Sequence, residues 1–274
     1  MTLILTCLEH EHIVQVADRR LTRLDGSLYD DDTNKAVFYC GRVAVAYTGL
    51  AVMEGKPTAE WIGSCMKDEA DVQPAMKRVA ERAEHCLKRY NIPDKRFAVV
   101  ATGWATLQGK QPLRPFICVA SNFLSDSWEW KASADERMTV KVQFLDEKCT
   151  HLIFAAGQSL SKKEKDHLDR LVRRAVKHGA KTMTLVRILG GMVRAVASGT
   201  DARAQRVGKG IIIHLLSRKA LMEGRRQIVT PLKTDTHSFL YVSREGRTDS
   251  FEGPIIACNG ALLAEFKFGK TPPQ

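Results

Sequence analysis

Residues 2–18 read TLILTCLEHEHIVQVAD, and this stretch indicates which secondary structure the chain forms first. Two runs of apolar and β-branched residues, Thr2 to Leu8 and Ile13 to Ala17, flank four polar residues, Glu9 to His12. Short runs of this composition, separated by a polar segment, are typical of neighbouring β-strands. The sequence therefore predicts that the first elements are two strands of one sheet.

A second pair of strands is predicted shortly afterwards. The apolar runs at residues 35–40 and 43–47 are joined by Gly41 and Arg42. A two-residue connection that contains glycine between two apolar runs is typical of a β-hairpin. The first fifty residues are thus expected to consist mainly of sheet.

The rest of the chain alternates between blocks of helices and blocks of strands. Apolar residues at three-and-four spacing predict helices, and alternating or continuous short apolar runs predict strands. Ser161 and Glu164 also fit a capping box at the start of one helix. Helices are predicted near residues 58–66, 76–90, 162–177 and 182–198, and strands near 97–101, 116–120, 138–144, 151–156, 211–216, 227–232, 239–243 and 255–266.

The order of these blocks favours a particular fold class. Strands, a helix pair, strands, a second helix pair and further strands follow one another, which favours α+β over a doubly wound sheet. Two stacked sheets between two helical layers, a four-layer αββα sandwich, would bury the apolar face of each helix. We expect one such domain at residues 1–217 and a β-rich extension at 218–274, packed on the same domain.

Composition excludes several classes of protein. Of 274 residues, 44% are hydrophobic and 27% are charged, which is an ordinary globular balance. No apolar run reaches the roughly 18 to 20 residues of a membrane-spanning helix, and the first residues lack the pattern of a secretory signal. The seven cysteines are widely spaced and include no C-x-x-C pair. We therefore expect a cytoplasmic protein without a membrane partner, a disulfide framework or a zinc site.

The positive net charge favours binding to acidic partners but does not identify any particular partner. Lys and Arg number 42 against 31 Asp and Glu, a net charge of +11. No arginine run or interleaving of basic and aromatic residues points to nucleic acid, which is an unlikely partner. The sequences His10-Glu11-His12 and Asp30-Asp31-Asp32 lack the ligand spacing of a zinc or calcium site, so no metal is predicted.

One feature near the N-terminus indicates a catalytic group. Thr2 follows Met1, and a small second residue is the usual context for removal of an initiator methionine. A terminal threonine would have a hydroxyl nucleophile and its own amine as general base, because an α-amine has a pKa of roughly 7.7 to 8.0. No diffusible cofactor is then required.

The spacing of further residues around Thr2 strengthens this hypothesis. Asp18 follows Thr2 by sixteen positions, and Gly49, in Thr48-Gly49, follows Lys35 by fourteen. The pattern resembles the proteasome β-subunit and HslV family of N-terminal-nucleophile hydrolases, with one extra residue between Thr2 and Lys35. The specific resemblance covers about the first fifty residues, and the order of elements agrees to about Leu216.

The resemblance implies a role for each matched residue. Thr2 would be the nucleophile, Lys35 a cation that favours its deprotonation, and Asp18 the partner that holds Lys35. The backbone N–H of Gly49 would stabilise the oxyanion. The resemblance also implies that four residues line the pocket for the substrate residue before the scissile bond: Leu21, Val37, Tyr47 and Ala51.

Two parts of the family pattern do not match. Where the family has a serine in a Gly-Ser-Gly turn, this sequence has Gly157-Gln158-Ser159, so Gln158 replaces that serine or Ser159 supplies it after a shift. The family also has an aspartate just before a Ser-Gly-Gly turn, and Asp201 is the only acidic residue near the corresponding Val207-Gly208-Lys209-Gly210.

Three functions are therefore considered. The first is an N-terminal-threonine hydrolase that acts on a peptide or small amide. The resemblance implies that it assembles into a homo-oligomer, as the rings of that family do. The second is a non-catalytic structural or regulatory subunit of the same fold. The third, motivated by net charge alone, is a basic nucleic-acid-associated protein.

Overall fold

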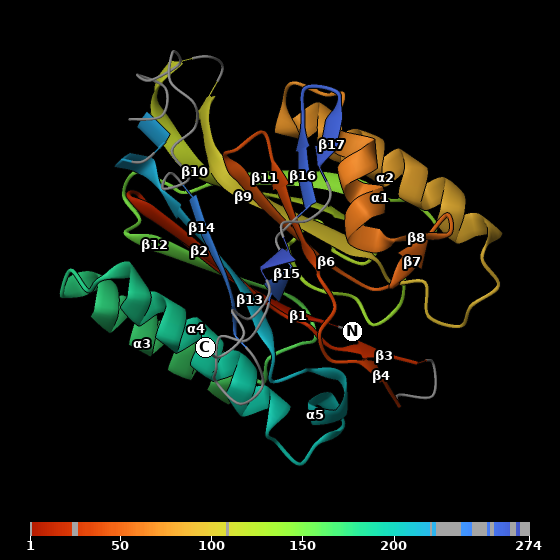
Figure 1. Cartoon of the computed structure of the whole chain (residues 1–274). Helices are drawn as coiled ribbons and strands as arrows, with labels where there is room; N and C mark the ends of the chain where they lie inside the picture. The colour runs from red at the N-terminus through yellow and green to blue at the C-terminus, as the bar shows by residue number, and fades with distance from the viewer. Residues whose placement is uncertain are drawn as a thin grey trace, which may run out of the picture.

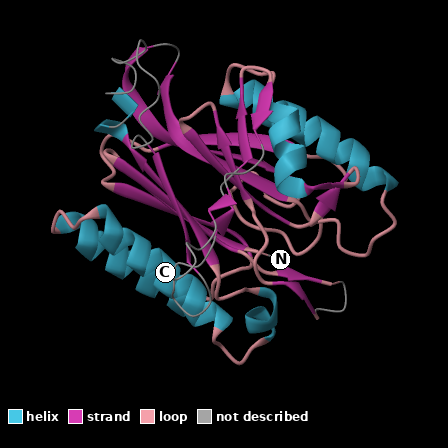
Figure 2. Ribbon diagram, viewed as in Figure 1, coloured by secondary structure: helices cyan, strands magenta, loops and turns pink. Residues whose placement is uncertain are grey.

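The computed structural model describes residues 2–23, 27–107, 110–219, 221–222, 237–242, 251–252, 255–263 and 267–268. These residues form a mixed α/β fold with two large sheets, three two-stranded sheets and five α-helices (Figure 1, Figure 2). The predicted block order is confirmed: strands, a helix pair, strands, a second helix pair and further strands follow one another, with a short fifth helix after the second pair.

The first large sheet contains the N-terminal strands. Its order is β12 (His151–Gly157), β1 (Leu3–Glu9), β2 (His12–Asp18), β13 (Ile211–Ser217) and β14 (His237–Val242). All four neighbouring pairs are antiparallel. Strand β1 lies between β12 and β2, and six of its seven residues are buried, which agrees with its almost uninterrupted run of apolar residues.

The second large sheet has seven strands. Its order is β11 (Thr139–Phe144), β10 (Lys110–Ser121), β9 (Ala98–Leu107), β6 (Val43–Thr48), β5 (Ala36–Tyr39), β16 (Ile255–Cys258) and β17 (Ala261–Leu263). The predicted hairpin around Gly41 is the antiparallel pair β5 and β6, and Gly41 has a positive φ of 62°. Strand β16 pairs in parallel with β5, with Ile255 beside Val37.

The four longer helices pack in pairs. Helices α1 (Thr58–Met66) and α2 (Val72–Arg89) contact each other and strands of the seven-stranded sheet. Helices α3 (Lys162–Lys177) and α4 (Thr182–Ala197) do the same on the five-stranded sheet. The capping box of Ser161 and Glu164 is present as predicted. Each pair covers the outer side of its sheet, as Figure 1 shows.

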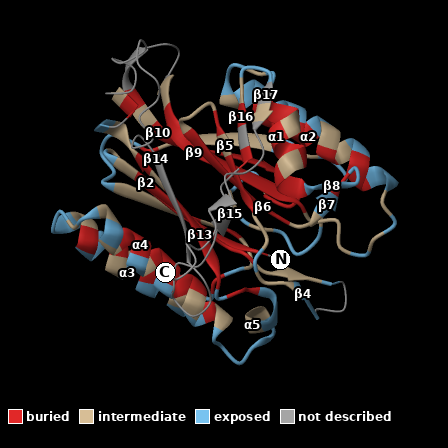
Figure 3. Ribbon diagram, viewed as in Figure 1, coloured by how far each residue is buried: buried red, intermediate tan, exposed pale blue. Residues whose placement is uncertain are grey.

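Three buried apolar clusters hold these elements together (Figure 3). One lies beneath α1 and α2, another beneath α3 and α4. The third joins strands of the two large sheets, with Ile4 and Ile212 from one sheet and Ala44 and Val100 from the other. Burial of these faces removes apolar surface from water and is the main source of stability.

Shorter elements were not expected from the sequence. They are the strand pairs β3 (Leu21–Thr22) with β4 (Leu28–Asp30), β7 (Val52–Met53) with β8 (Lys56–Pro57), and β15 (Phe251–Glu252) with β18 (Lys267–Phe268), and the helix α5 (Ala202–Arg206). The strand expected at 227–232 lies outside the described residues. The division into residues 1–217 and 218–274 stays a prediction, although β16 belongs to the seven-stranded sheet.

None of the helices in the described part of the chain has both the length and the apolarity needed to cross a membrane.

Candidate active site

The ends of three strands bring Thr2, Asp18 and Lys35 together. Thr2 immediately precedes β1, Asp18 is the last residue of β2, and Lys35 immediately precedes β5. In the antiparallel register of β1 and β2, Ile4 lies opposite Ala17, so the next positions, Leu3 and Asp18, adjoin. The backbone N–H of Leu3 donates a 2.6 Å hydrogen bond to the side-chain oxygen Oδ2 of Asp18.

Lys35 lies between the hydroxyl and the carboxylate. Its Nζ donates a hydrogen bond of 2.6 Å to Thr2 Oγ1 and lies 3.6 Å from Asp18 Oδ1. It also donates to the carbonyl oxygen of Arg20. The side chains of Lys35 and Asp18 are fully buried, and Thr2 is only 4% exposed. Removing one partner of a buried ion pair is costly, because the charge that remains has no counterion.

Burial changes the acidity of Lys35. Removal of the ammonium group from water lowers the pKa of Lys35 below its ordinary value, while the negative charge of Asp18 acts in the opposite direction. Lys35 therefore loses its proton more readily than a lysine at the surface does. A group of this type beside a hydroxyl can exchange a proton with it.

Asp18 is held by backbone donors from three segments. Besides Leu3, its carboxylate accepts hydrogen bonds from the N–H groups of Arg20 at 2.9 Å and Gly208 at 3.1 Å. A Cβ at position 208 would lie 2.8 Å from Cβ of Arg20, so only glycine lets the backbone approach this closely. These contacts stabilise the ionised carboxylate and fix its position.

The backbone of Thr2 is fixed by Thr48, to which the sequence assigned no role, and by Gly157 and Gln158 of the turn that departs from the family pattern. Thr2 N donates to Thr48 Oγ1 at 3.1 Å, and that hydroxyl donates to the Thr2 carbonyl at 3.3 Å. Gly157 has a φ of +82°, and a Cβ there would lie 1.9 Å from the Thr2 carbonyl oxygen. The N–H of the next residue, Gln158, donates to that same oxygen at 2.9 Å.

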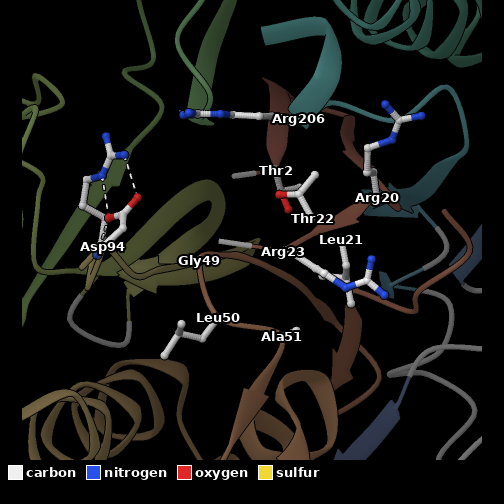
Figure 4. A pocket seen from close by; sticks show the side chains of 11 residues that line it. Thr2, Arg20, Leu21, Thr22, Arg23, Gly49, Leu50, Ala51, Asp94 and Arg206 are labelled. Atoms are coloured by element: carbon white, nitrogen blue, oxygen red, sulfur yellow. Dashed lines mark hydrogen bonds and ion pairs between the residues drawn. The ribbon is translucent and has the colours of Figure 1, made fainter. Parts of the chain in front are cut away.

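Thr2 lines a pocket of about 280 Å³. Figure 4 shows Thr2 with Gly49, Leu21 and Ala51, three of the other residues predicted for the site, around this pocket. Gly49 has a φ of +118° and adjoins the backbone of Arg96, where a Cβ would lie only 2.5 Å from the carbonyl oxygen.

The remaining predicted site residues lie elsewhere. Val37 and Tyr47 are buried in the apolar cluster beneath α1 and α2. The carbonyl of Ser159 accepts a hydrogen bond from Arg203. Asp201 caps α5 and forms a 2.5 Å ion pair with the same Arg203. In the described part of the chain, no hydrogen bond or ion pair joins Ser159 or Asp201 to Thr2, Asp18 or Lys35.

Other acidic and histidine residues do not converge. Asp31 and Asp32 form ion pairs with Arg20 and Arg19. Within the described ranges, no group of three or more His, Cys, Asp or Glu residues is arranged to hold a metal ion.

Comparison with known proteins shows similarity at the level of the fold. No protein-family model and no curated protein matches the sequence. Among solved structures, a Gly-1 mutant of Anbu from Hyphomicrobium sp. strain MC1 matches with a TM-score of 0.50 and 11% identity. The match covers 79% of this chain and 83% of that chain. Anbu has a proteasome-like fold, and the present chain is similar to it in fold.

The comparisons correct the family assigned from residue spacing. The first fifty residues resemble proteasome β-subunits and HslV, but the absence of any family match does not support membership in that family. An identity of 11% with Anbu shows a shared fold alone. The assignment to the proteasome β-subunit and HslV family is therefore wrong; the similarity that stands is one of fold.

Proposed function

We propose that this protein is an N-terminal-threonine amide hydrolase in which Thr2 is the nucleophile and peptides or small amides are the substrates. The observation that carries the proposal is the 2.6 Å contact of Lys35 Nζ with Thr2 Oγ1, next to buried Asp18. The paired helices and joined sheets support the corresponding αββα four-layer sandwich as the fold.

In the proposed reaction, Thr2 Oγ1 attacks the carbonyl carbon of the amide as its proton passes to the Thr2 amine. The C–N bond then breaks, the leaving amine takes the proton, and an ester to Thr2 remains. Water hydrolyses the ester and releases the carboxylic acid and the free hydroxyl. The backbone N–H of Gly49 is proposed to stabilise the oxyanion, an interaction worth about 2.7 to 4 kcal/mol.

Lys35 and Asp18 prepare the nucleophile in this proposal. The ammonium group favours the alkoxide character of Thr2 Oγ1 because an opposite charge at hydrogen-bond distance lowers the pKa of a hydroxyl. Asp18 orients Lys35 and, through Leu3, the backbone that carries the hydroxyl. Both residues are inaccessible to water, so their effect on the nucleophile is weakly screened.

The mechanism requires Thr2 at the mature N-terminus, because an acylated nitrogen cannot act as a base. Intact-mass measurement and N-terminal sequencing of the purified protein test this requirement. Assembly into a homo-oligomer is also proposed, on the similarity of fold to a proteasome-like protein, and light scattering tests it.

The decisive experiment is covalent labelling with a β-lactone or epoxyketone probe. We expect one label, located on Thr2 by peptide mapping. Thr2→Ala abolishes labelling and amide hydrolysis, whereas Thr2→Ser retains both because it keeps a hydroxyl and an amine. Thr6→Ala in β1 is the matched control for a threonine change in the same segment, and it keeps the label.

The same experiment distinguishes the second hypothesis. A protein with an exposed Thr2 terminus that takes no label and hydrolyses no peptide would be a structural or regulatory subunit, and the hydrolase proposal would be rejected.

A further inference from the structure

The pocket beside Thr2 is rich in arginine. Among the described residues that line it are four arginines and one aspartate, Asp94. A concentration of one sign of charge in a pocket raises the local concentration of ligands of the opposite sign. Whether this applies here depends on which guanidinium groups already have a carboxylate partner.

Two of the four arginines are neutralised within the protein. Arg20 binds both carboxylate oxygens of Asp31, at 2.6 and 3.0 Å. Arg96 binds both carboxylate oxygens of Asp94, at 2.9 and 2.7 Å. These bidentate pairs occupy the donor edges of Arg20 and Arg96. They also use Asp94, which is the one acidic residue among the described residues that line the pocket.

The other two arginines keep their charge available. Arg206, at the end of α5, and Arg23, after β3, are both exposed, and neither forms an ion pair with a carboxylate of the described residues. Arg23 lies 5.5 Å from the centre of the Tyr29 ring and donates to the Leu28 carbonyl, which orients its guanidinium without neutralising it. In Figure 4, Arg206 and Arg23 lie on either side of Thr2.

We propose that the pocket beside Thr2 selects peptides that carry an aspartate or glutamate side chain next to the scissile amide, and that Arg206 and Arg23 are its specificity-determining residues. The inference rests on the proposed function of Thr2. It names the substrate class of that site: amides with an adjacent carboxylate. The net charge of +11 attracts such acidic chains in addition.

Two measurements test the proposal separately from catalysis. The first measures, by calorimetry, the affinity of the Thr2→Ala variant for two peptides with blocked termini. The two peptides are identical except that one contains glutamate where the other contains glutamine. We expect about tenfold tighter binding of the glutamate peptide, decreasing at high salt because exposed charges are screened. The second is cleavage of fluorogenic amides with glutamate, glutamine or lysine before the scissile bond, which we expect to rank in that order.

Substitutions assign the preference to the two arginines. Arg206→Gln and Arg23→Gln are each expected to reduce the preference for glutamate over glutamine by about threefold, which is the scale of a partly exposed ion pair. The double variant is expected to show no preference for glutamate over glutamine. Arg174→Gln, an exposed arginine on α3, is the matched control and leaves the preference unchanged.

The outcomes separate this inference from the proposed function. Equal binding of the glutamate and glutamine peptides to Thr2→Ala would overturn the inference. So would cleavage of the lysine substrate as fast as the glutamate substrate, although hydrolysis by Thr2 would then stand. Selective binding of the glutamate peptide in a protein whose Thr2 takes no probe would support the acidic pocket ligand and reject the hydrolase.

Discussion

The backbone N–H of Leu3 donates a 2.6 Å hydrogen bond to Asp18, the residue whose carboxylate also lies 3.6 Å from Lys35 Nζ. Leu3 directly follows Thr2, so one buried carboxylate positions the backbone that carries the hydroxyl and the cation that contacts it. The alignment of the candidate nucleophile is therefore set by the register of β1 and β2.

Asp18 and Lys35 are expected to depend on each other for stability. Asp18→Asn leaves the ammonium group without its partner, and Lys35→Met leaves the carboxylate without its partner. Each change should lower the free energy of unfolding by about 3–5 kcal/mol, because an uncompensated charge stays buried. The double variant should lose less than the sum of the two, as measured by urea denaturation. Simple additivity would contradict the coupling of the two charges.

The pH dependence of stability should report the acidity of Lys35. Its pKa in the folded protein lies below the ordinary value of 10.5, mainly because of burial. Between these two values the unfolded chain binds a proton that the folded protein does not, so the free energy of unfolding rises with pH. The stability that Lys35 contributes in this way is fully present above pH 10.5, and it is lost as the pH falls through the folded-state pKa of Lys35.

Urea denaturation of the wild type and Lys35→Met across alkaline pH measures this contribution as a difference. Subtraction of the two curves removes the other groups that titrate in the same range. A difference that declines with rising pH would mean that the charge of Asp18 outweighs the cost of burial, contrary to our expectation.

Thr48 is expected to act as a positioning residue for Thr2. Thr48→Val keeps the shape but removes the acceptor of the Thr2 N–H bond, and should cost about 1 kcal/mol of stability. If Thr2 is the mature terminus, loss of this acceptor disfavours the protonated amine, so the acidic limb of the pH–rate profile should move to lower pH.

Thr48→Ser retains the hydroxyl and serves as the control in the same assays. Its profile should coincide with that of the wild type. An unchanged acidic limb in Thr48→Val would exclude contact between Thr48 and the catalytic amine.

Gly157→Ala should disturb the site more than an alanine at another glycine with positive φ. At Gly157 the added Cβ would lie 1.9 Å from the Thr2 carbonyl oxygen, which belongs to the backbone and cannot rotate away. We expect a loss of more than about 3 kcal/mol in the free energy of unfolding, together with loss of probe labelling at Thr2.

Gly179, after α3, provides the comparison. Its φ is +60°, but a Cβ there meets no atom within 4 Å. Gly179→Ala should therefore cost only the backbone strain of about 1–2 kcal/mol and leave labelling intact. Equal losses in the two variants would mean that strain, rather than contact with Thr2, decides the effect at Gly157.

Much of the fold could be predicted because its main elements are locally encoded. The apolar run of β1, the hairpin of β5 and β6 and the capping box of α3 all carry their signal within a few residues. Helix α2 begins at Val72, four residues before the predicted start at Met76. Its first turn contains Pro74, which a helix tolerates at that place, and too few apolar residues to extend the periodic pattern.

Long-range contacts could not be predicted in the same way. The pairing of β16 with β5 joins distant segments, and nothing in either sequence specifies a parallel neighbour. In the candidate site, the proximity of Thr2, Asp18 and Lys35 was implied by the resemblance of their spacing to the proteasome β-subunit and HslV pattern. The spacing could not indicate Thr48 or Gly208, because their contacts use a single hydroxyl and a backbone N–H that follow no residue pattern.

The pairing of β16 with β5 also bears on how the protein is made. Synthesis proceeds from the N-terminus, so β5 emerges from the ribosome long before its parallel neighbour exists. Until β16 has been synthesised, the backbone groups along that side of β5 lack their neighbouring strand, and an uncovered strand edge can pair with other chains. The nascent chain is thus exposed to aggregation at the edge of β5 until β16 has emerged and paired with it.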